Sequence, residues 1–245
     1  MKPKAFVLLS GGIDSTVCLY EARYTFGSNV EAVSIYYGQR HMKEIEYARK
    51  SAGALDIPHR IVNLASIVPK TMLTDVMAKI PEVSYAEIPG VSPTYVPFRN
   101  GLLLSAVASI VHGEYVKESE YGDNALTEMP LPEWAIYFGA HAEDAQNWAY
   151  PDCTPEFLGA MANAIYIGTY RAIRLHTPLQ WDTKRDIILK GEQLGVDWRR
   201  TWSCYAGKTL HCGVCPTCRA RRAGFKAAMI QDPTEYEVTK EEAPP

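Results

Sequence analysis

Short apolar runs alternate with amphipathic segments over most of this chain. Runs rich in branched and aromatic residues predict buried strands, and apolar residues at helical spacing predict helices. Strands and helices in this alternation predict an α/β fold with a parallel, doubly wound sheet of about five strands. The predicted strands are residues 4–9, 30–37, 59–64, 134–139 and 173–179. The predicted helices are residues 16–22, 42–55, 101–111 and 183–194, with one more that begins at Pro155 after Thr154 as its N-cap.

Three segments fall outside this alternation. Residues 65–99 hold five prolines, and a loop this long inside a compact domain is usually functional or mobile. Residues 113–133 are acidic and polar, so we expect an exposed insertion there. The residues after Asp232 are expected to form a frayed tail without function.

Composition narrows the class of protein. The chain has 245 residues, of which 47% are hydrophobic and 22% charged, as in one globular domain with an appendage. A net charge of −3 gives no basic footprint for a large nucleic-acid surface. No apolar run approaches membrane-spanning length, and no secretory signal is visible. We therefore expect a soluble cytoplasmic protein without a membrane or nucleic-acid partner.

Residues 10–15, with the sequence SGGIDS, lie between the first predicted strand and helix. Two glycines there allow a tight turn and a close backbone approach to a ligand, and the helix start favours an anion. Asp14 would repel a phosphate unless a metal ion lies between them, so the stretch predicts a nucleotide with Mg²⁺. It is not a Walker A loop. The alternative is an ordinary turn in which a serine caps the helix.

Two further strand ends are polar. Residues 37–41 and 140–148 each follow a predicted strand. Because ligands bind beyond the carboxyl ends of parallel strands, these segments should face the same crevice as residues 10–15.

Four of the six cysteines lie within fifteen residues. Their Cys-x7-Cys-x2-Cys-x2-Cys spacing suits a structural tetrahedral zinc, with an iron–sulfur cluster as the alternative. The basic run 219–222 that follows is expected to face solvent or a partner subunit, and Cys18 to lie in the core. The predicted zinc ligands are Cys204, Cys212, Cys215 and Cys218.

The SGGIDS stretch resembles the SGGxDS loop of the PP-loop ATP pyrophosphatases, whose fold is adenine nucleotide alpha hydrolase-like. Within that superfamily the chain resembles the 7-cyano-7-deazaguanine synthase family of queuosine biosynthesis, and the resemblance covers nearly the whole chain. The other matching stretches are residues 37–41, 96–100, 150–157, 177–179, 183–184 and 202–219.

The resemblance implies a ligase that uses ATP, Mg²⁺ and a structural Zn²⁺ and is a homodimer. It would convert 7-carboxy-7-deazaguanine and ammonia to the nitrile by adenylation, amide formation and dehydration. Residues 1–200 would form the ATP-binding domain, 201–232 the zinc segment and 233–245 a tail. The insertion 113–133 and the form of residues 139–148 depart from the usual pattern, so a variant that stops at 7-amido-7-deazaguanine for DNA modification stays an alternative. Another PP-loop tRNA-modifying enzyme, or a zinc-ribbon binding module that acts through residues 219–222, would be the others.

The same resemblance assigns site residues, while His141 stays unassigned. Asp14 would hold Mg²⁺, Arg99 would pair with a carboxylate or phosphate, and Lys184 would offset pyrophosphate charge. These three are the predicted catalytic residues. The predicted ATP-binding residues are Leu8, Leu9, Ser10, Gly11, Gly12, Ile13, Asp14, Ser15, Thr16, Val17 and Cys18. The predicted substrate-binding residues are Gln39, Arg99, Asn100, Asp144 and Asp152.

Overall fold

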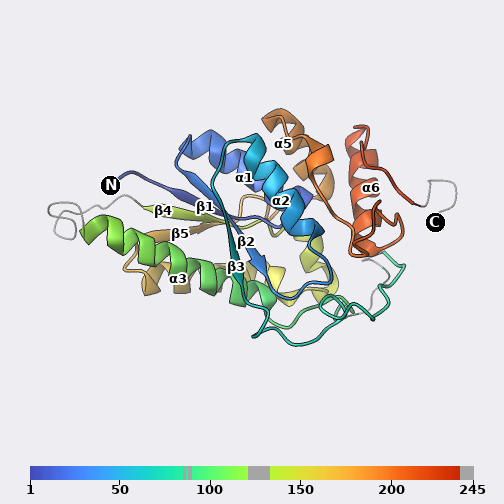
Figure 1. The fold of residues 1–245 in the computed structure, drawn as a ribbon, viewed down its shortest axis with the longest axis horizontal. Helices are drawn as coiled ribbons and strands as arrows, with labels where there is room; N and C mark the ends of the chain where they lie inside the picture. Colours follow the sequence, from blue (N-terminus) through green and yellow to red (C-terminus); the bar gives the residue numbers. More distant parts are fainter. Residues whose placement is uncertain (85–86, 88–89, 121–132, 238–245) are drawn as a thin grey trace.

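Five parallel strands form one sheet in the order β3-β2-β1-β4-β5, which confirms the predicted fold class (Figure 1). The structure is a computed structural model, and it describes residues 1–84, 87, 90–120 and 133–237. Each strand lies where the hydrophobic pattern predicts it, and most end one to three residues earlier. The strands are β1 Ala5–Leu8, β2 Val30–Tyr36, β3 His59–Asn63, β4 Trp134–Tyr137 and β5 Ile173–His176.

Helices connect the strands at the predicted positions, but two are longer than predicted. The first begins three residues earlier, and the third extends from Arg99 to Glu120. The predicted cap at Thr154 is confirmed, since its side chain accepts a hydrogen bond from the Phe157 N–H. For the helix predicted at residues 183–194 the sequence offers Asp182 or Thr183 as the cap, and the structure has Thr183, which forms a capping box with Asp186. The α-helices are α1 Ile13–Phe26, α2 Lys43–Ala54, α3 Arg99–Glu120, α4 Pro155–Gly168, α5 Lys184–Leu194 and α6 Pro216–Ala228. Short 3-10 helices are η2 Ala142–Trp148, η3 Pro151–Cys153 and η4 Trp198–Arg200.

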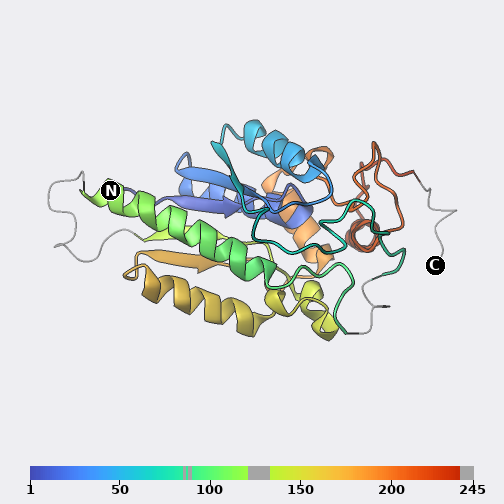
Figure 2. The same ribbon diagram turned by 60° about the horizontal axis from the view of Figure 1, so that its bottom comes forward.

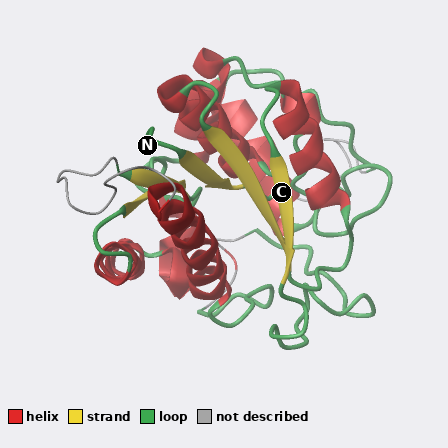
Figure 3. Ribbon diagram, turned by 60° about the vertical axis from the view of Figure 1, so that its left-hand side comes forward, coloured by secondary structure: helices red, strands yellow, loops and turns green. Residues whose placement is uncertain are grey.

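Helices lie on both faces of the sheet (Figures 2 and 3). A hydrophobic layer fills the space between the sheet and the helices on each face. Successive strand side chains point to opposite faces. Val7 of β1 therefore packs with α1, α2 and α5, whereas Phe6 packs with α3 and α4. Cys18 is fully buried in the first layer, as predicted. Because both faces are covered, β1 is apolar at every position.

The strand order places a switch point beside β1. From β1 the chain runs to β2 and β3 on one side, and later to β4 and β5 on the other. Ligands of open α/β sheets bind beyond the carboxyl ends of the strands at such a point. The SGGIDS loop is the connection from β1 to α1, so it lies at this position.

The acidic segment 113–133 is not an exposed insertion over its first part. Residues 113–120 are the last turns of α3. Glu114 forms ion pairs with Lys4 and Arg60, which anchor the helix beside the amino-terminal ends of the strands. The prediction was wrong here because acidic residues need not be solvent-facing when cations from other elements meet them. Residues 121–132 lie outside the described residues.

The basic run also departs from its prediction. Arg221 is buried: its guanidinium donates to Thr201 Oγ1 at 2.8 Å and to the Trp198 carbonyl at 3.2 Å, and it pairs with Asp232 at 3.4 Å. Residues 233–237 are likewise not frayed, since the N–H of Glu237 donates to the His211 carbonyl at 2.7 Å. Residues 238–245 lie outside the described residues.

Candidate active site

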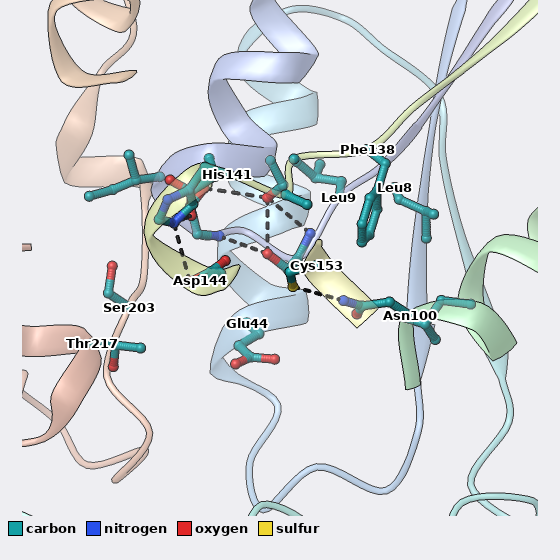
Figure 4. Close-up of a pocket in the computed structure, with 18 of the residues that line it drawn as sticks. Leu8, Leu9, Glu44, Asn100, Phe138, His141, Asp144, Cys153, Ser203 and Thr217 are labelled. Carbon is teal, nitrogen blue, oxygen red and sulfur yellow. Dashed lines mark hydrogen bonds and ion pairs between the residues drawn. The ribbon is translucent and has the colours of Figure 1, made fainter. Parts of the chain in front are cut away.

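A cavity opens at the carboxyl end of β1 (Figure 4). Its walls come from the β1–α1 loop, the first turns of α2 and α3, the segment after β4, the start of α5 and the segment that leads into α6. The predicted site residues that line it are Leu8, Leu9, Ser10, Gly12, Ile13, Asp14, Ser15, Arg99, Asn100, Asp144 and Lys184.

The β1–α1 loop presents an open helix end to this cavity. Ser10 and Ser15 share a hydrogen bond of 2.9 Å between their hydroxyl groups, and Ser15 Oγ also accepts from the Ser10 N–H. Gly12 is the N-cap of α1 and provides no side-chain cap. The first N–H groups of α1 and the positive end of its dipole are therefore available to an anion such as a phosphate.

Gly11 allows α2 to pack directly on this loop. Its φ of +82° lies in the left-handed region, and a Cβ there would lie 2.3 Å from the Glu44 carbonyl oxygen and 2.6 Å from the Ala48 nitrogen. Its carbonyl accepts a hydrogen bond of 2.8 Å from the Trp202 N–H. Gly11 does not line the cavity; it joins the loop to α2 and to the C-terminal segment.

Four charged or polar side chains form a cluster on one side of the cavity. Lys184 Nζ donates to Asp14 Oδ1 at 2.6 Å and lies 3.0 Å from His141 Nε2, which is 3.3 Å from Asp144 Oδ1. Burial raises the pKa of Asp14, but Lys184 and His141 outweigh it, so the pKa of Asp14 lies below its ordinary value. Asp14 is therefore a carboxylate at neutral pH, the form that can hold a cation.

Arg99 provides a second cation in the same cavity. Its guanidinium lies 5.5 Å from the centre of the Tyr37 ring, and its Nε donates weakly to Asn100 Oδ1 at 3.4 Å. No carboxylate of the described residues forms an ion pair with it. An arginine stays charged at any ordinary pH, so this half-buried cation can receive an anionic ligand.

Asp152 and Gln39 shape the walls and do not line the cavity. The Asp152 carboxylate accepts a hydrogen bond of 2.9 Å from the Asn100 N–H, so it caps the start of α3. Burial raises the pKa of Asp152, although Asn100 and Arg99 act against it. Gln39 Oε1 accepts from the Tyr37 N–H at 2.8 Å and holds the turn after β2. Thr16, Val17 and Cys18 lie behind the loop in the buried part of α1.

Sequence reasoning missed several lining residues. Glu44 lies in the first turn of α2, and its place after the end of β2 could have indicated it. His141 was named but not assigned, and its Nδ1 is buried without a hydrogen-bond partner among the described residues. The C-terminal segment adds Trp202, Ser203 and Thr217, which only the folded chain brings to the cavity.

The four clustered cysteines fit a tetrahedral metal ion. Their sulfur atoms all lie within 4.8 Å of one another, and Cys212 Sγ lies 3.9 Å from Cys218 Sγ. Metal–sulfur bonds of about 2.3 Å in a tetrahedron require sulfurs roughly 3.8 Å apart. The N–H groups of Ala206 and Cys212 both donate to Cys204 Sγ at 3.3 Å, which would stabilise a thiolate there.

Within the described part of the chain, no helix is both long enough and apolar enough to cross a membrane.

Comparisons with known proteins agree on one family. A family model described as "Queuosine biosynthesis protein QueC" matches residues 4–229. A 7-cyano-7-deazaguanine synthase of Caldicellulosiruptor bescii is 38% identical over 238 residues, which cover 96% of this chain and 98% of that protein. The protein of the same name from Methanoregula boonei is 38% identical over 236 residues, with 96% of this chain and 99% of that protein covered. That from Thermoplasma acidophilum is 38% identical over 242 residues, with 96% and 93% covered.

Proposed function

Because the chain belongs to the QueC family of queuosine biosynthesis proteins, we propose that it converts 7-carboxy-7-deazaguanine and ammonia to 7-cyano-7-deazaguanine with ATP. It is an enzyme of the ligase type. In the proposed reaction ATP adenylates the substrate carboxylate and releases pyrophosphate, and ammonia then displaces AMP to give an amide. A second ATP then adenylates the amide oxygen and releases pyrophosphate, and the C–O bond breaks so that AMP departs with that oxygen. The two N–H protons of the amide are lost in these steps, which leaves the nitrile.

One observation carries this proposal: a single cavity holds both an open helix N-terminus and a cation without a carboxylate partner. The N-terminus of α1 suits the phosphates of ATP. Arg99 suits the carboxylate of the second substrate. Adenylation joins these two anions, and charge neutralisation with positioning supplies most of the catalysis in such a transfer.

The polar residues at the cavity then have the following proposed roles. Asp14 would hold Mg²⁺, which would neutralise phosphate charge, and Lys184, whose Nζ lies 2.6 Å from Asp14 Oδ1, would offset the charge of the departing pyrophosphate. Asp144 accepts hydrogen bonds from the guanine-like N–H edge. Asn100 contacts the substrate beside Arg99, and Asp152 acts by fixing Asn100. Of the residues assigned to ATP, those that line the cavity would contact it: Leu8, Leu9, Ser10, Gly12, Ile13, Asp14 and Ser15. Gly11, Thr16, Val17 and Cys18 would act by supporting the loop from behind.

We further propose that the four cysteines bind Zn²⁺. With four thiolates no position is left open for a reactant, so the ion would be structural. Its binding would fold the segment that carries Trp202 and Ser203 into the cavity wall. By the family resemblance we also propose a cytoplasmic homodimer, which light scattering of the purified protein would test.

A reaction with 7-carboxy-7-deazaguanine, ATP and ammonium, followed by mass spectrometry, tests the proposed function. We expect a nitrile product and AMP with pyrophosphate. An amide as the end product would instead identify an enzyme that stops after the first activation. No product of either kind, or release of ADP alone, would refute the proposal.

A further inference from the structure

Glu44 lies in the first turn of α2, where that helix follows the carboxyl end of β2. Its side chain is half-buried and lines the cavity together with Arg99 and Asp144. Figure 4 shows its carboxyl group inside the cavity, below Cys153 in that view. Among the described residues it has no ion-pair partner. Glu44 is therefore a carboxyl group held in the cavity without a structural task.

The position of Glu44 is fixed relative to the β1–α1 loop, residues 10–15, which we call the phosphate loop because it is the proposed site of the ATP phosphates. The Glu44 carbonyl oxygen lies so near Gly11 that a Cβ on Gly11 would approach it to 2.3 Å. Ile45 beside it is buried, at 3% exposure. A carboxyl group mounted on this turn keeps its place while ligands bind, as proton transfer requires.

The surroundings of Glu44 bring its pKa close to neutral pH. Burial raises its pKa to about 7, and Arg99 partly offsets that rise. The neighbouring Tyr37 has its pKa raised to about 12 by burial and by Glu44, so it stays neutral. The other titratable side chains that line the cavity are Asp14, His141, Glu143, Asp144, Cys153, Lys184, Tyr205 and Arg221. Glu44 can therefore both accept and release a proton near neutral pH.

We propose that Glu44 is a catalytic residue that takes a proton from the nitrogen nucleophile as the amide forms. This inference rests on the proposed function of the cavity, since it assigns a role within that reaction.

The proposed step balances as follows. The nitrogen of ammonia forms a bond to the acyl carbon of the adenylate, and the bond from that carbon to the phosphate oxygen breaks. Its electron pair leaves with AMP, which departs as the dianion. One N–H proton goes to a Glu44 carboxylate oxygen and is later lost to solvent. The products are the neutral amide, AMP and protonated Glu44.

The charge in the cavity changes during the reaction, and this change favours ionisation of Glu44 after adenylation and not before it. While the substrate carboxylate is paired with Arg99, the added negative charge keeps Glu44 protonated. Adenylation converts that carboxylate to a neutral acyl group, so Arg99 is no longer paired with a substrate anion and favours the ionised form of Glu44. The base thus becomes available once the electrophile has formed.

A Glu44→Gln variant tests the step, because glutamine keeps the shape and cannot accept a proton. The matched control is Glu46→Gln, since Glu46 is an exposed residue of the same helical turn that pairs with Lys50 at 2.8 Å. Two reactions are compared: substrate-dependent exchange of pyrophosphate into ATP, which needs no ammonia, and amide formation. Amide formation is measured against pH at constant free ammonia.

We expect Glu44→Gln to retain the exchange and to lose amide formation by about 10²-fold or more. The acid limb of the wild-type profile near neutral pH should disappear. Hydroxylamine, a less basic nucleophile that is uncharged at neutral pH, should still give hydroxamate with the variant. Glu46→Gln should match the wild type throughout.

Two outcomes would overturn the inference: undiminished amide formation by Glu44→Gln, or loss of exchange and hydroxamate along with the amide, which would show a role in binding. Failure of the wild-type protein to catalyse the exchange with 7-carboxy-7-deazaguanine would instead refute the proposed function.

Discussion

Two carboxyl groups of the cavity have pKa values that move in opposite directions. Asp14 is buried, but Lys184 and His141 hold its pKa below the ordinary value. Glu44 is affected chiefly by burial, and its pKa rises to about 7. The same chemical group therefore provides a permanent charge at one point and an exchangeable proton at another. The reason is that Lys184 pairs directly with Asp14, whereas no cation of the described residues forms an ion pair with Glu44.

The raised pKa of Glu44 has a consequence for stability. Between the unfolded value of 4.5 and about 7, the folded protein binds this proton more tightly than the unfolded chain does. Protonated Glu44 therefore contributes to the free energy of unfolding. This contribution is fully present below pH 4.5 and is lost as pH rises through 7. We expect Glu44→Gln to gain stability relative to wild type on going from about pH 5 to about pH 8. Urea unfolding at both pH values measures this, and an identical pH dependence of the two proteins would contradict the raised pKa.

Gly11 gives a second prediction for a single residue. A Gly11→Ala variant places a methyl group against the backbone of α2 in a backbone conformation that L-residues rarely adopt. The loop must shift, and a displacement of about 1 Å at such a site costs about 10²-fold in activity. Pyrophosphate exchange measures the loss. Gly53→Ala in α2 is the control, since a Cβ there meets nothing within 4 Å; equal activity of both variants would contradict the prediction.

At the scale of elements, helix α5 positions Lys184. Thr183 and Asp186 form a capping box, so the helix begins at Lys184 itself, and this first residue reaches Asp14 at the start of α1. Two helix N-termini thus meet at the cavity, and their dipoles add to its positive potential. The capping residues are local in sequence, whereas the meeting of the two helices depends on their packing against each other.

Removal of this cap should affect both stability and binding. Thr183→Ala is expected to lower the free energy of unfolding by about 1 kcal/mol. Because Lys184 then lies in a fraying turn, the KM for ATP should rise with a smaller change in kcat. Denaturant unfolding and steady-state kinetics measure these effects. The control is Thr25→Ala in α1, which removes a hydroxyl that donates to the Glu21 carbonyl of its own helix and does not line the cavity; its KM for ATP should be unchanged.

At the scale of the whole molecule, the C-terminal segment, residues 201–232, forms part of the wall of the cavity. It lies beside α5 and the phosphate loop (Figure 1). The Trp202 N–H donates to Gly11, and Trp202 Nε1 donates to the carbonyl of Cys204, one of the four clustered cysteines. Trp202 therefore connects the cysteine cluster with the phosphate loop. We expect that loss of structure in the cluster also displaces the loop.

Removal of the metal should therefore abolish ATP use. We expect a chelator that extracts zinc from the four cysteines to eliminate pyrophosphate exchange, and stoichiometric Zn²⁺ to restore it. Metal content and exchange are measured on the same samples. Full exchange in metal-free protein would show that the segment keeps its fold without the ion.

The sequence predicted the features that depend on residues close together in the chain, and it missed those that depend on contacts between distant segments. The five strands, the cap at Thr183 and the cysteine cluster came from residues close together in the chain, and the family resemblance is confirmed. The buried state of Arg221 could not be predicted, because its partners at Thr201, Trp198 and Asp232 come from segments that only folding brings near. A buried guanidinium is tolerated only with such partners.

The SGGIDS loop shows the same division. By itself the sequence determined a strand, a glycine turn and a helix start, because periodicity and backbone freedom are properties of neighbouring residues. Only the tertiary structure decided that Glu44, Lys184 and Trp202 surround this loop, and which of its residues line the cavity. The physical reason is that burial and electrostatic potential at one atom depend on every element packed around it.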